Sequence, residues 1–140
     1  MMALSTVNFN STPQQPQCFE VRFSKLRHPD YANQRQCRYD VRCRETHMLY
    51  QRSILLPKQA TVEKVYHNIL IQEQMYKRNS GADDNNNPQP PASPTMQEYP
   101  IEKFHISAQE YYQQIKDKTL DECLMQNLHS VYLPDIYLNQ

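Results

Sequence analysis

Glycine is almost absent from this chain of 140 residues, which contains only Gly81. The loops that hold nucleotide phosphates use several glycines, because their backbone must come close to the phosphate and adopt conformations that a side chain disfavours. The sequence therefore excludes the common nucleotide-binding loops. Tryptophan is absent too, whereas there are ten tyrosines. Tyrosine is favoured at protein interfaces, so this composition indicates a binding surface.

Long apolar runs are also missing, since none approaches the ~18 residues that a membrane span needs. The first residues, "MMALSTVNFNST", lack the charged and then apolar build of a secretory signal. We therefore expect a soluble, intracellular protein with no membrane partner. In that setting the four cysteines are expected to be reduced rather than bridged.

The net charge is zero, but the two halves of the chain differ. Residues 1–79 carry 12 Lys and Arg against 6 Asp and Glu, whereas residues 80–140 carry 3 against 9. A basic half is compatible with nucleic acid or an acidic partner, although such charges more often form a solvated face. We therefore treat nucleic acid as a possible partner that is not favoured.

Two segments contain few large apolar side chains. They are residues 1–17 and residues 79–98, "NSGADDNNNPQPPASPTMQE". Such segments cannot bury enough apolar surface to offset the entropy lost on ordering. We predict a disordered tail at 1–17 and a disordered insertion at 79–98, which divides one domain into halves at 18–78 and 99–140.

Three segments before residue 60 have the pattern of strands. "CFEVRFSKL" (18–26) and "QCRYDVRCRE" (36–45) alternate apolar and polar residues, and "HMLYQRSILLP" (47–57) is rich in strand formers. We expect the first two to form a long hairpin. In the second, the apolar face comprises Cys37, Tyr39, Val41 and Cys43, and the polar face comprises Arg38, Asp40, Arg42 and Arg44.

The next stretch predicts a helix over 61–77, with Thr61 as its N-cap. Its expected apolar stripe consists of Val62, Val65, Tyr66, Ile69, Leu70 and Met75.

The C-terminal third contains two S/T-x-x-E patterns typical of helix starts, Ser107 with Glu110 and Thr119 with Glu122. "YPIEKFHIS" (99–107) alternates loosely enough to be a strand instead, so both interpretations stay open there. The closing "SVYLPDIYL" fits an edge or terminal strand, because Pro134 cannot donate to a ladder.

In order, these elements predict an α+β fold of the ubiquitin-like β-grasp type: strand, strand, helix, insertion, strand, short turn and final strand. The chain resembles the RAWUL domain, a ubiquitin-like module of Polycomb-group RING-finger proteins. The resemblance is carried by "FEVRFSKLRHP", "ATVEKVYHNIL", the insertion at 79–98 and "LPDIYL". The stretch before "ATV" is long for such a domain, and "CRYDVRCRE" has no counterpart in it.

The resemblance implies a non-catalytic protein-binding module, a subunit of a nuclear complex of the Polycomb, transcription-repressing type, with the cytoplasm as second choice. A partner peptide or domain would bind the edge of the sheet. Ligase activity does not carry over, because four cysteines cannot supply the two zinc sites of a RING finger. We expect no enzymatic activity and no small-molecule substrate. The expected partner-binding residues are Arg38, Tyr39, Val41, Arg42, Arg44, Tyr132, Ile136 and Tyr137.

An alternative is a small RNA-binding or zinc-containing protein that uses the basic hairpin 18–52. Cys37, Cys43 and His47 have the C-x5-C-x3-H spacing that ends a CCCH zinc finger, with Cys18 as a distant fourth ligand. Strand alternation would instead direct Cys37 and Cys43 into the core as thiols, so we expect no cofactor. Cys123 lies on the apolar side of "LDECLMQNL", where core packing is favoured over a nucleophile.

Overall fold

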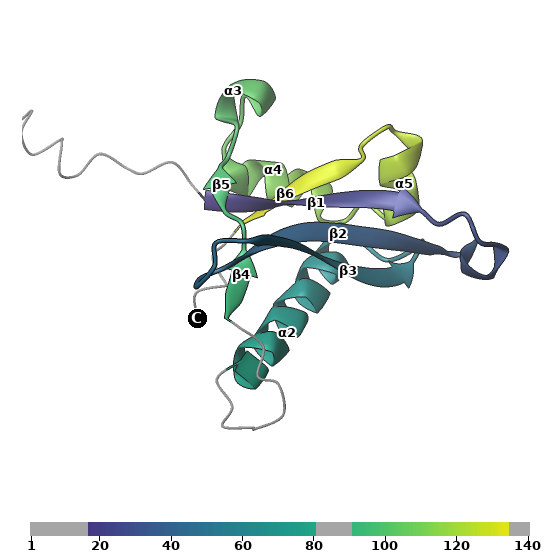
Figure 1. Ribbon diagram of the computed structural model, residues 1–140. Helices are drawn as coiled ribbons and strands as arrows, with labels where there is room; N and C mark the ends of the chain where they lie inside the picture. Colours follow the sequence, from purple (N-terminus) through teal and green to yellow (C-terminus); the bar gives the residue numbers. More distant parts are fainter. Residues whose placement is uncertain (1–16, 81–90, 135–140) are drawn as a thin grey trace, which may run out of the picture.

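The computed structural model describes residues 17–80 and 91–134 of the chain. Its strands are β1 (Gln17–Lys25), β2 (Gln34–Cys43), β3 (Leu49–Pro57), β4 (Ala92–Pro94), β5 (Gln97–Glu98) and β6 (Ser130–Pro134). Its helices are the 3-10 turn η1 (Pro29–Tyr31) and α2 (Val62–Ser80), α3 (Ile101–Phe104), α4 (Ala108–Ile115) and α5 (Leu120–Met125). The predicted α+β class is confirmed (Figure 1).

The strands form one antiparallel sheet with the order β3-β2-β1-β6 across its middle. Three strands precede α2, which confirms the three strand segments predicted before residue 60, whereas the β-grasp order has only two there. β6 then returns antiparallel to β1, placing Cys18 opposite Pro134 and Arg22 opposite Ser130. The β-grasp assignment is not confirmed by this arrangement.

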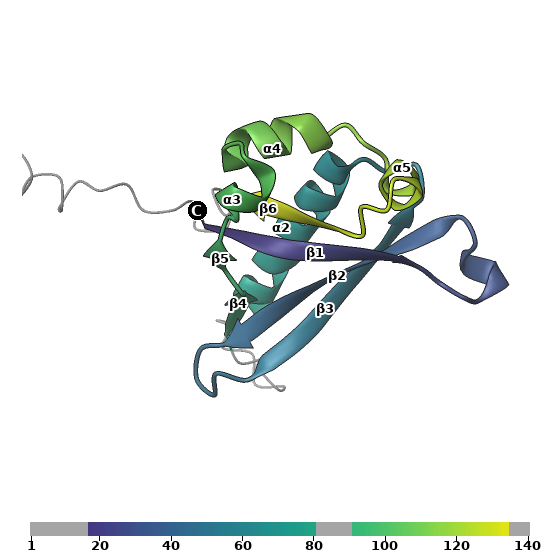
Figure 2. The ribbon, with the colours of Figure 1, turned by 90° about the horizontal axis from the view of Figure 1, so that it is seen from above.

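β1 and β2 diverge along their length, and the segment with β4 and β5 lies between their separated ends (Figure 2). The two long strands pair only through residues 22–25 and 35–38. Beyond this point β4 pairs with β2, β5 pairs with β1, and the Thr95 amide donates to the Asp40 carbonyl over 2.9 Å. The predicted hairpin is thus confirmed at its closed end.

The prediction of disorder is wrong for residues 92–98, which satisfy backbone groups that the diverging strands leave unpaired.

The inner face of the sheet packs against α2, α4 and α5. As the alternation predicted, every second residue of β1 and β2 is buried on this face. The largest fully buried side chains are Tyr39, Tyr66, Phe19, Ile69, Leu120, Leu133, Glu73, Val21, Val41, Val62, Val65 and Val131.

The long helix α2 begins where the sequence predicted. The Thr61 hydroxyl accepts from the Lys64 amide over 3.2 Å, which confirms the N-cap. The apolar stripe is wrong at one position, because Met75 is 56% exposed while Glu73 is buried. Glu73 takes the inward position because Arg52 on β3 and Tyr39 on β2 supply partners for its carboxylate.

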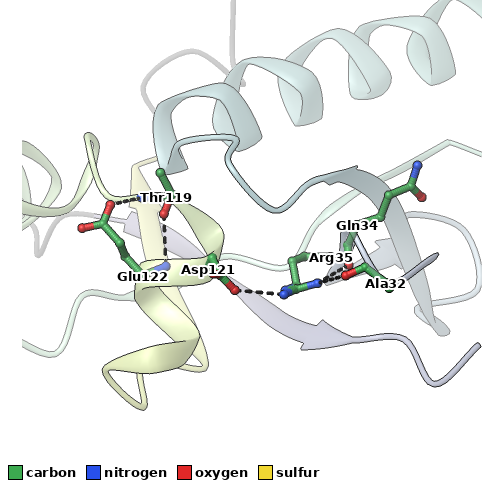
Figure 3. Close-up of polar contacts among 6 residues, drawn as sticks. All are labelled: Ala32, Gln34, Arg35, Thr119, Asp121 and Glu122. Atoms are coloured by element: carbon green, nitrogen blue, oxygen red, sulfur yellow. Dashed lines mark hydrogen bonds and ion pairs between the residues drawn. The ribbon is translucent and has the colours of Figure 1, made fainter. Parts of the chain in front are cut away.

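Helices rather than a strand follow residue 100, so the strand interpretation of 99–107 is wrong. Ser107 caps α4 by accepting from the Glu110 amide. The capping box at α5 is confirmed, with Thr119 and Glu122 bonded reciprocally through side chain and backbone (Figure 3). Between these two residues in the chain, Asp121 accepts from Arg35 of β2 over 2.9 Å, which ties α5 to the sheet.

Candidate protein-binding edge

The two long sides of the sheet are covered differently. On one side, α4 packs beside β6, and Tyr132 of β6 contacts the rings of Phe104 and Tyr111. On the other side, β3 pairs with β2 alone among the described residues, through a continuous register from Gln34 opposite Pro57 to Arg42 opposite Leu49 (Figure 2). β3 is therefore an edge strand of nine residues.

Two hydrogen bonds that flank β3 show which of its backbone groups face outward. The Cys43 amide donates to the Met48 carbonyl, and the Lys58 amide donates to the Asn33 carbonyl, each over 2.9 Å. Hydrogen-bonded and non-bonded pairs alternate in an antiparallel ladder, so the even-numbered residues of β3 bond to β2. The odd-numbered residues direct their N–H and C=O groups away from the sheet. These residues are Leu49, Gln51, Ser53 and Leu55.

This edge lacks lysines, internal prolines and bulges, three of the features by which proteins usually block strand addition. Pro57 stands at its last position, and the register with β2 contains no bulge. Its only charged residue is Arg52. Several exposed large apolar side chains accompany it: Met48 (58% exposed), Leu49 (55%), Leu55 (44%) and Tyr50 (41%). An accessible strand of this kind is a template for another strand.

A groove with a volume of about 400 Å³ runs between β3 and α2. Its lining residues are Ile54, Asn68, Ile71, Gln72, Met75 and Tyr76. Ile71 and Met75 are 60% and 56% exposed on the surface of α2. The groove therefore presents apolar side chains and neutral amides directly beside the open edge.

An ion pair holds α2 against this edge. Arg52 Nη1 lies 2.5 Å from Glu73 Oε1 and 2.6 Å from Oε2, and Tyr39 donates its hydroxyl hydrogen to Oε2 over 2.5 Å. The Arg52 guanidinium also lies 3.7 Å from the centre of the Tyr76 ring, a cation–π contact. Burial and the neighbouring Glu73 charge raise the pKa of Tyr39, so this phenol stays protonated as a donor. The groove thus has a fixed wall.

The predicted partner-binding residues of β2 lie on different faces. Arg38 and Arg42 lie on the outer face of the sheet, as predicted, whereas Tyr39 and Val41 are fully buried on the inner face. The prediction that Tyr39 and Val41 contact a partner is wrong, because strand alternation commits both to the core. Arg44 follows the end of β2 and is exposed.

Part of the basic outer face is neutralised within the chain. Asp40 lies 3.1 Å from the Arg22 guanidinium, and Glu20 lies 3.7 Å from the same group. Arg42 donates to the His47 carbonyl over 3.2 Å. Carboxylates therefore alternate with arginines here, which is the arrangement of a solvated charged face.

The predicted C-terminal contacts do not join the β3 edge. Tyr132 is half-buried at the opposite side of the sheet, and Ile136 and Tyr137 lie outside the described residues. The sequence reasoning missed Leu49, Ile71 and Met75, which the fold leaves exposed near β3. The only sequence signal for Leu49 was the scarcity of charge in 47–57, and this signal does not extend to Ile71 and Met75 of α2.

The four cysteines are buried and carry thiols rather than disulfides. Burial raises the pKa of Cys37 to about 12, with a smaller effect from Cys123, and burial raises the pKa of Cys123 to about 11. Both thiols are therefore protonated at neutral pH, and the protonated form of a thiol is a poor nucleophile. Within residues 17–80 and 91–134, no group of three or more His, Cys, Asp or Glu side chains is placed to hold a metal ion.

Comparisons with models of protein families, with curated proteins and with solved structures found no match to this chain. Among the helices that the structure describes, none combines the length and apolar character needed to cross a bilayer. Functional assignment therefore rests on the geometry of the β3 edge and its groove.

Proposed function

We propose that this chain is a non-catalytic protein-binding module that accepts an added strand along β3. The observation that carries the proposal is the open, bulge-free edge of β3 beside an apolar groove. In strand addition, main-chain hydrogen bonds supply affinity, and pockets for alternate side chains supply specificity. Leu49, Gln51, Ser53 and Leu55 offer the main-chain groups, and the groove between β3 and α2 offers the pocket.

The groove favours an added strand with apolar side chains facing α2. Ile71 and Met75 are 60% and 56% exposed, so covering either one contributes only part of the ~1.5–3 kcal/mol that full burial of such a side chain gives. The one charged group of β3, Arg52, is already paired with Glu73. An added strand therefore needs no counter-charge in the groove.

The resemblance to RAWUL domains supplies the cellular setting of the proposal. It would make the chain a ubiquitin-like β-grasp subunit of a nuclear, Polycomb-type repressive complex, with protein partners. This part is supported by the short motifs "ATVEKVYHNIL" and "LPDIYL". It is tested by the location of the tagged chain in cells and by the presence of RING-finger proteins among its stable partners.

Strand addition is tested by affinity purification of the tagged full chain from its own cells, with Ser53→Lys compared with the native sequence. Ser53 directs its backbone groups outward, so a lysine here blocks the edge without altering the core. Ser24→Lys is the matched control, because it adds the same charge to the outer face of β1, opposite Gln36 of β2 and away from β3. We expect stoichiometric partners to be lost with Ser53→Lys and retained with Ser24→Lys.

Two outcomes would contradict strand addition at β3. The first is an unchanged set of partners with Ser53→Lys. The second is recovery of RNA without a stoichiometric protein, lost with Arg38→Glu/Arg42→Glu, which would instead support the alternative that uses the basic hairpin.

A further inference from the structure

We infer that the strand added to β3 comes from a second copy of this chain, so that two sheets join edge to edge around a two-fold axis. This inference rests on the proposed function and names its partner. In closed two-fold assemblies the same surface patch meets itself, so the patch must be self-complementary. The β3 edge meets that condition in its charge, its hydrogen-bonding groups and its groove.

Charge permits β3 to pair with itself. Like charges placed directly opposite each other destabilise a strand pair. β3 carries one charged residue, Arg52, and the nearly buried carboxylate of Glu73 neutralises it within the same copy. By contrast, β2 has Arg35, Arg38 and Arg42 as well as Asp40. Two β3 strands therefore meet without net repulsion.

The hydrogen-bonding groups set the register. Only odd-numbered residues of β3 direct N–H and C=O groups outward, so an odd-numbered residue must face an odd-numbered residue of the second copy. Ser53 is the middle residue of Leu49–Pro57. A two-fold axis that passes midway between the Ser53 residues of the two copies pairs the two strands over their whole length. Ser53 then faces its own equivalent, and Gln51 of one copy faces Leu55 of the other.

The groove is covered in the same step. A two-fold axis perpendicular to the sheet keeps α2 of both copies on one side of the continuous sheet. The even-numbered side chains of β3 lie on the α2 side of the sheet: Ile54 lines the groove of its own copy, and Tyr50, which is 41% exposed, lies on the same side as the groove of the other copy. There Ile71 and Met75 are exposed and carry no charge. Each copy thus brings its Tyr50 ring to the side of the sheet on which the groove of its partner lies.

The first test is the mass of the full chain in solution, measured by sedimentation velocity over a range of concentrations. The single chain has a mass of 16.7 kDa, and we expect the native protein to sediment at twice this mass. Ser53→Lys places two lysines opposite each other at the axis and is expected to weaken the dimer by up to about fivefold. Ser24→Lys is expected to leave the dimer unchanged.

The second test fixes the register by cross-linking. With Ser53→Cys, the two introduced cysteines face each other across the strand pair. Their Cα atoms are then ~5.5 Å apart, a distance that a disulfide can span. With Gln51→Cys, the two thiols are separated by four residues along the strands, or about 13 Å, which is too far. Diamide oxidation is expected to link Ser53→Cys into covalent dimers much faster than Gln51→Cys. The native cysteines are buried and give a low background.

The outcomes separate this inference from the proposed function. A native chain that stays at 16.7 kDa at every concentration, or a dimer whose dissociation constant is unchanged by Ser53→Lys, overturns the inference. Equal cross-linking of Ser53→Cys and Gln51→Cys does the same. If Ser53→Lys no longer co-purifies a protein other than this chain that the native chain does co-purify, the proposed function is supported, and that protein is the one that adds a strand to β3. If no partner of either kind depends on Ser53, both proposals fail.

Discussion

The carboxylate of Glu73 lies 2.5 Å from the guanidinium of Arg52, and both side chains are almost withdrawn from solvent. This pair joins the middle of α2 to the edge strand β3, and the Tyr39 hydroxyl extends the network to β2. The groove beside β3 has one wall on α2 and the other on β3. The pair therefore fixes the spacing between the two walls of the proposed binding site.

Glu73→Gln is expected to lower the free energy of unfolding by about 3–5 kcal/mol, because it leaves the Arg52 cation nearly buried without a counter-charge. Urea denaturation measures this change. Glu63→Gln on the first turn of the same helix is the control, with an expected loss of at most about 1 kcal/mol from the helix dipole. Equal losses in the two variants would show that the Glu73 pair contributes no more than a surface charge.

Tyr39→Phe removes the hydroxyl that donates to Glu73 while keeping the ring in the core. Hydrogen bonds to charged groups contribute about 1.5–3 kcal/mol, and we expect a loss of this size in urea denaturation. Tyr66→Phe, which removes a hydroxyl that donates to the uncharged Pro134 carbonyl, is the comparison. A smaller loss for Tyr39→Phe than for Tyr66→Phe would contradict the assigned role of Glu73 as a charged acceptor.

Asp121→Asn is expected to destabilise the fold by about 1.5–3 kcal/mol, less than Glu73→Gln. The reason lies in the partners that Arg35 retains, since its guanidinium also donates to the Ala32 and Gln34 carbonyls over 3.0 and 2.8 Å (Figure 3). Asp121 is also about one-third exposed, so water screens the pair. Thermal and urea denaturation of Asp121→Asn and Glu73→Gln measure the two losses in stability. A larger loss for Asp121→Asn than for Glu73→Gln would contradict this prediction.

Alkaline pH is expected to weaken the fold through the buried thiols. In the folded chain the pKa of Cys37 is raised to about 12 and that of Cys123 to about 11, whereas an unfolded cysteine ionises near ~8.5. The unfolded state thus releases protons first, so stability is full below pH ~8.5 and falls as the pH rises toward 11 and 12.

The slope is bounded by about 1.4 kcal/mol per pH unit for each thiol. Denaturation of Cys123→Ala between pH 8 and 11 checks the effect, because this variant should lose stability less steeply than the native chain. Identical slopes would show that the Cys123 thiol does not contribute.

The alternation in "CFEVRFSKL" and "QCRYDVRCRE" was enough to predict β1 and β2, because each strand buries one face. β4 and β5 carried no such signal. They form because β1 and β2 diverge, which is a property of the whole sheet and not of residues 92–98.

The candidate site was less predictable than the strands. Which strand lies at the edge depends on the order of the strands in the sheet. The pattern of residues within one strand does not reveal that order. The exposure of Met75 and the burial of Glu73 reverse the usual preference of both residue types, because Arg52 and Tyr39 arrive from distant strands.

Amide hydrogen exchange along Leu49–Pro57, resolved by residue, tests the binding edge most directly. In the separate chain at low concentration, the amides of Arg52 and Ile54 bond to β2 and should exchange slowly, whereas those of Gln51, Ser53 and Leu55 should exchange quickly. When the chain associates, the account predicts that the amides of Gln51, Ser53 and Leu55 become protected. Association that leaves these three amides exchanging as quickly as before would contradict strand addition at β3.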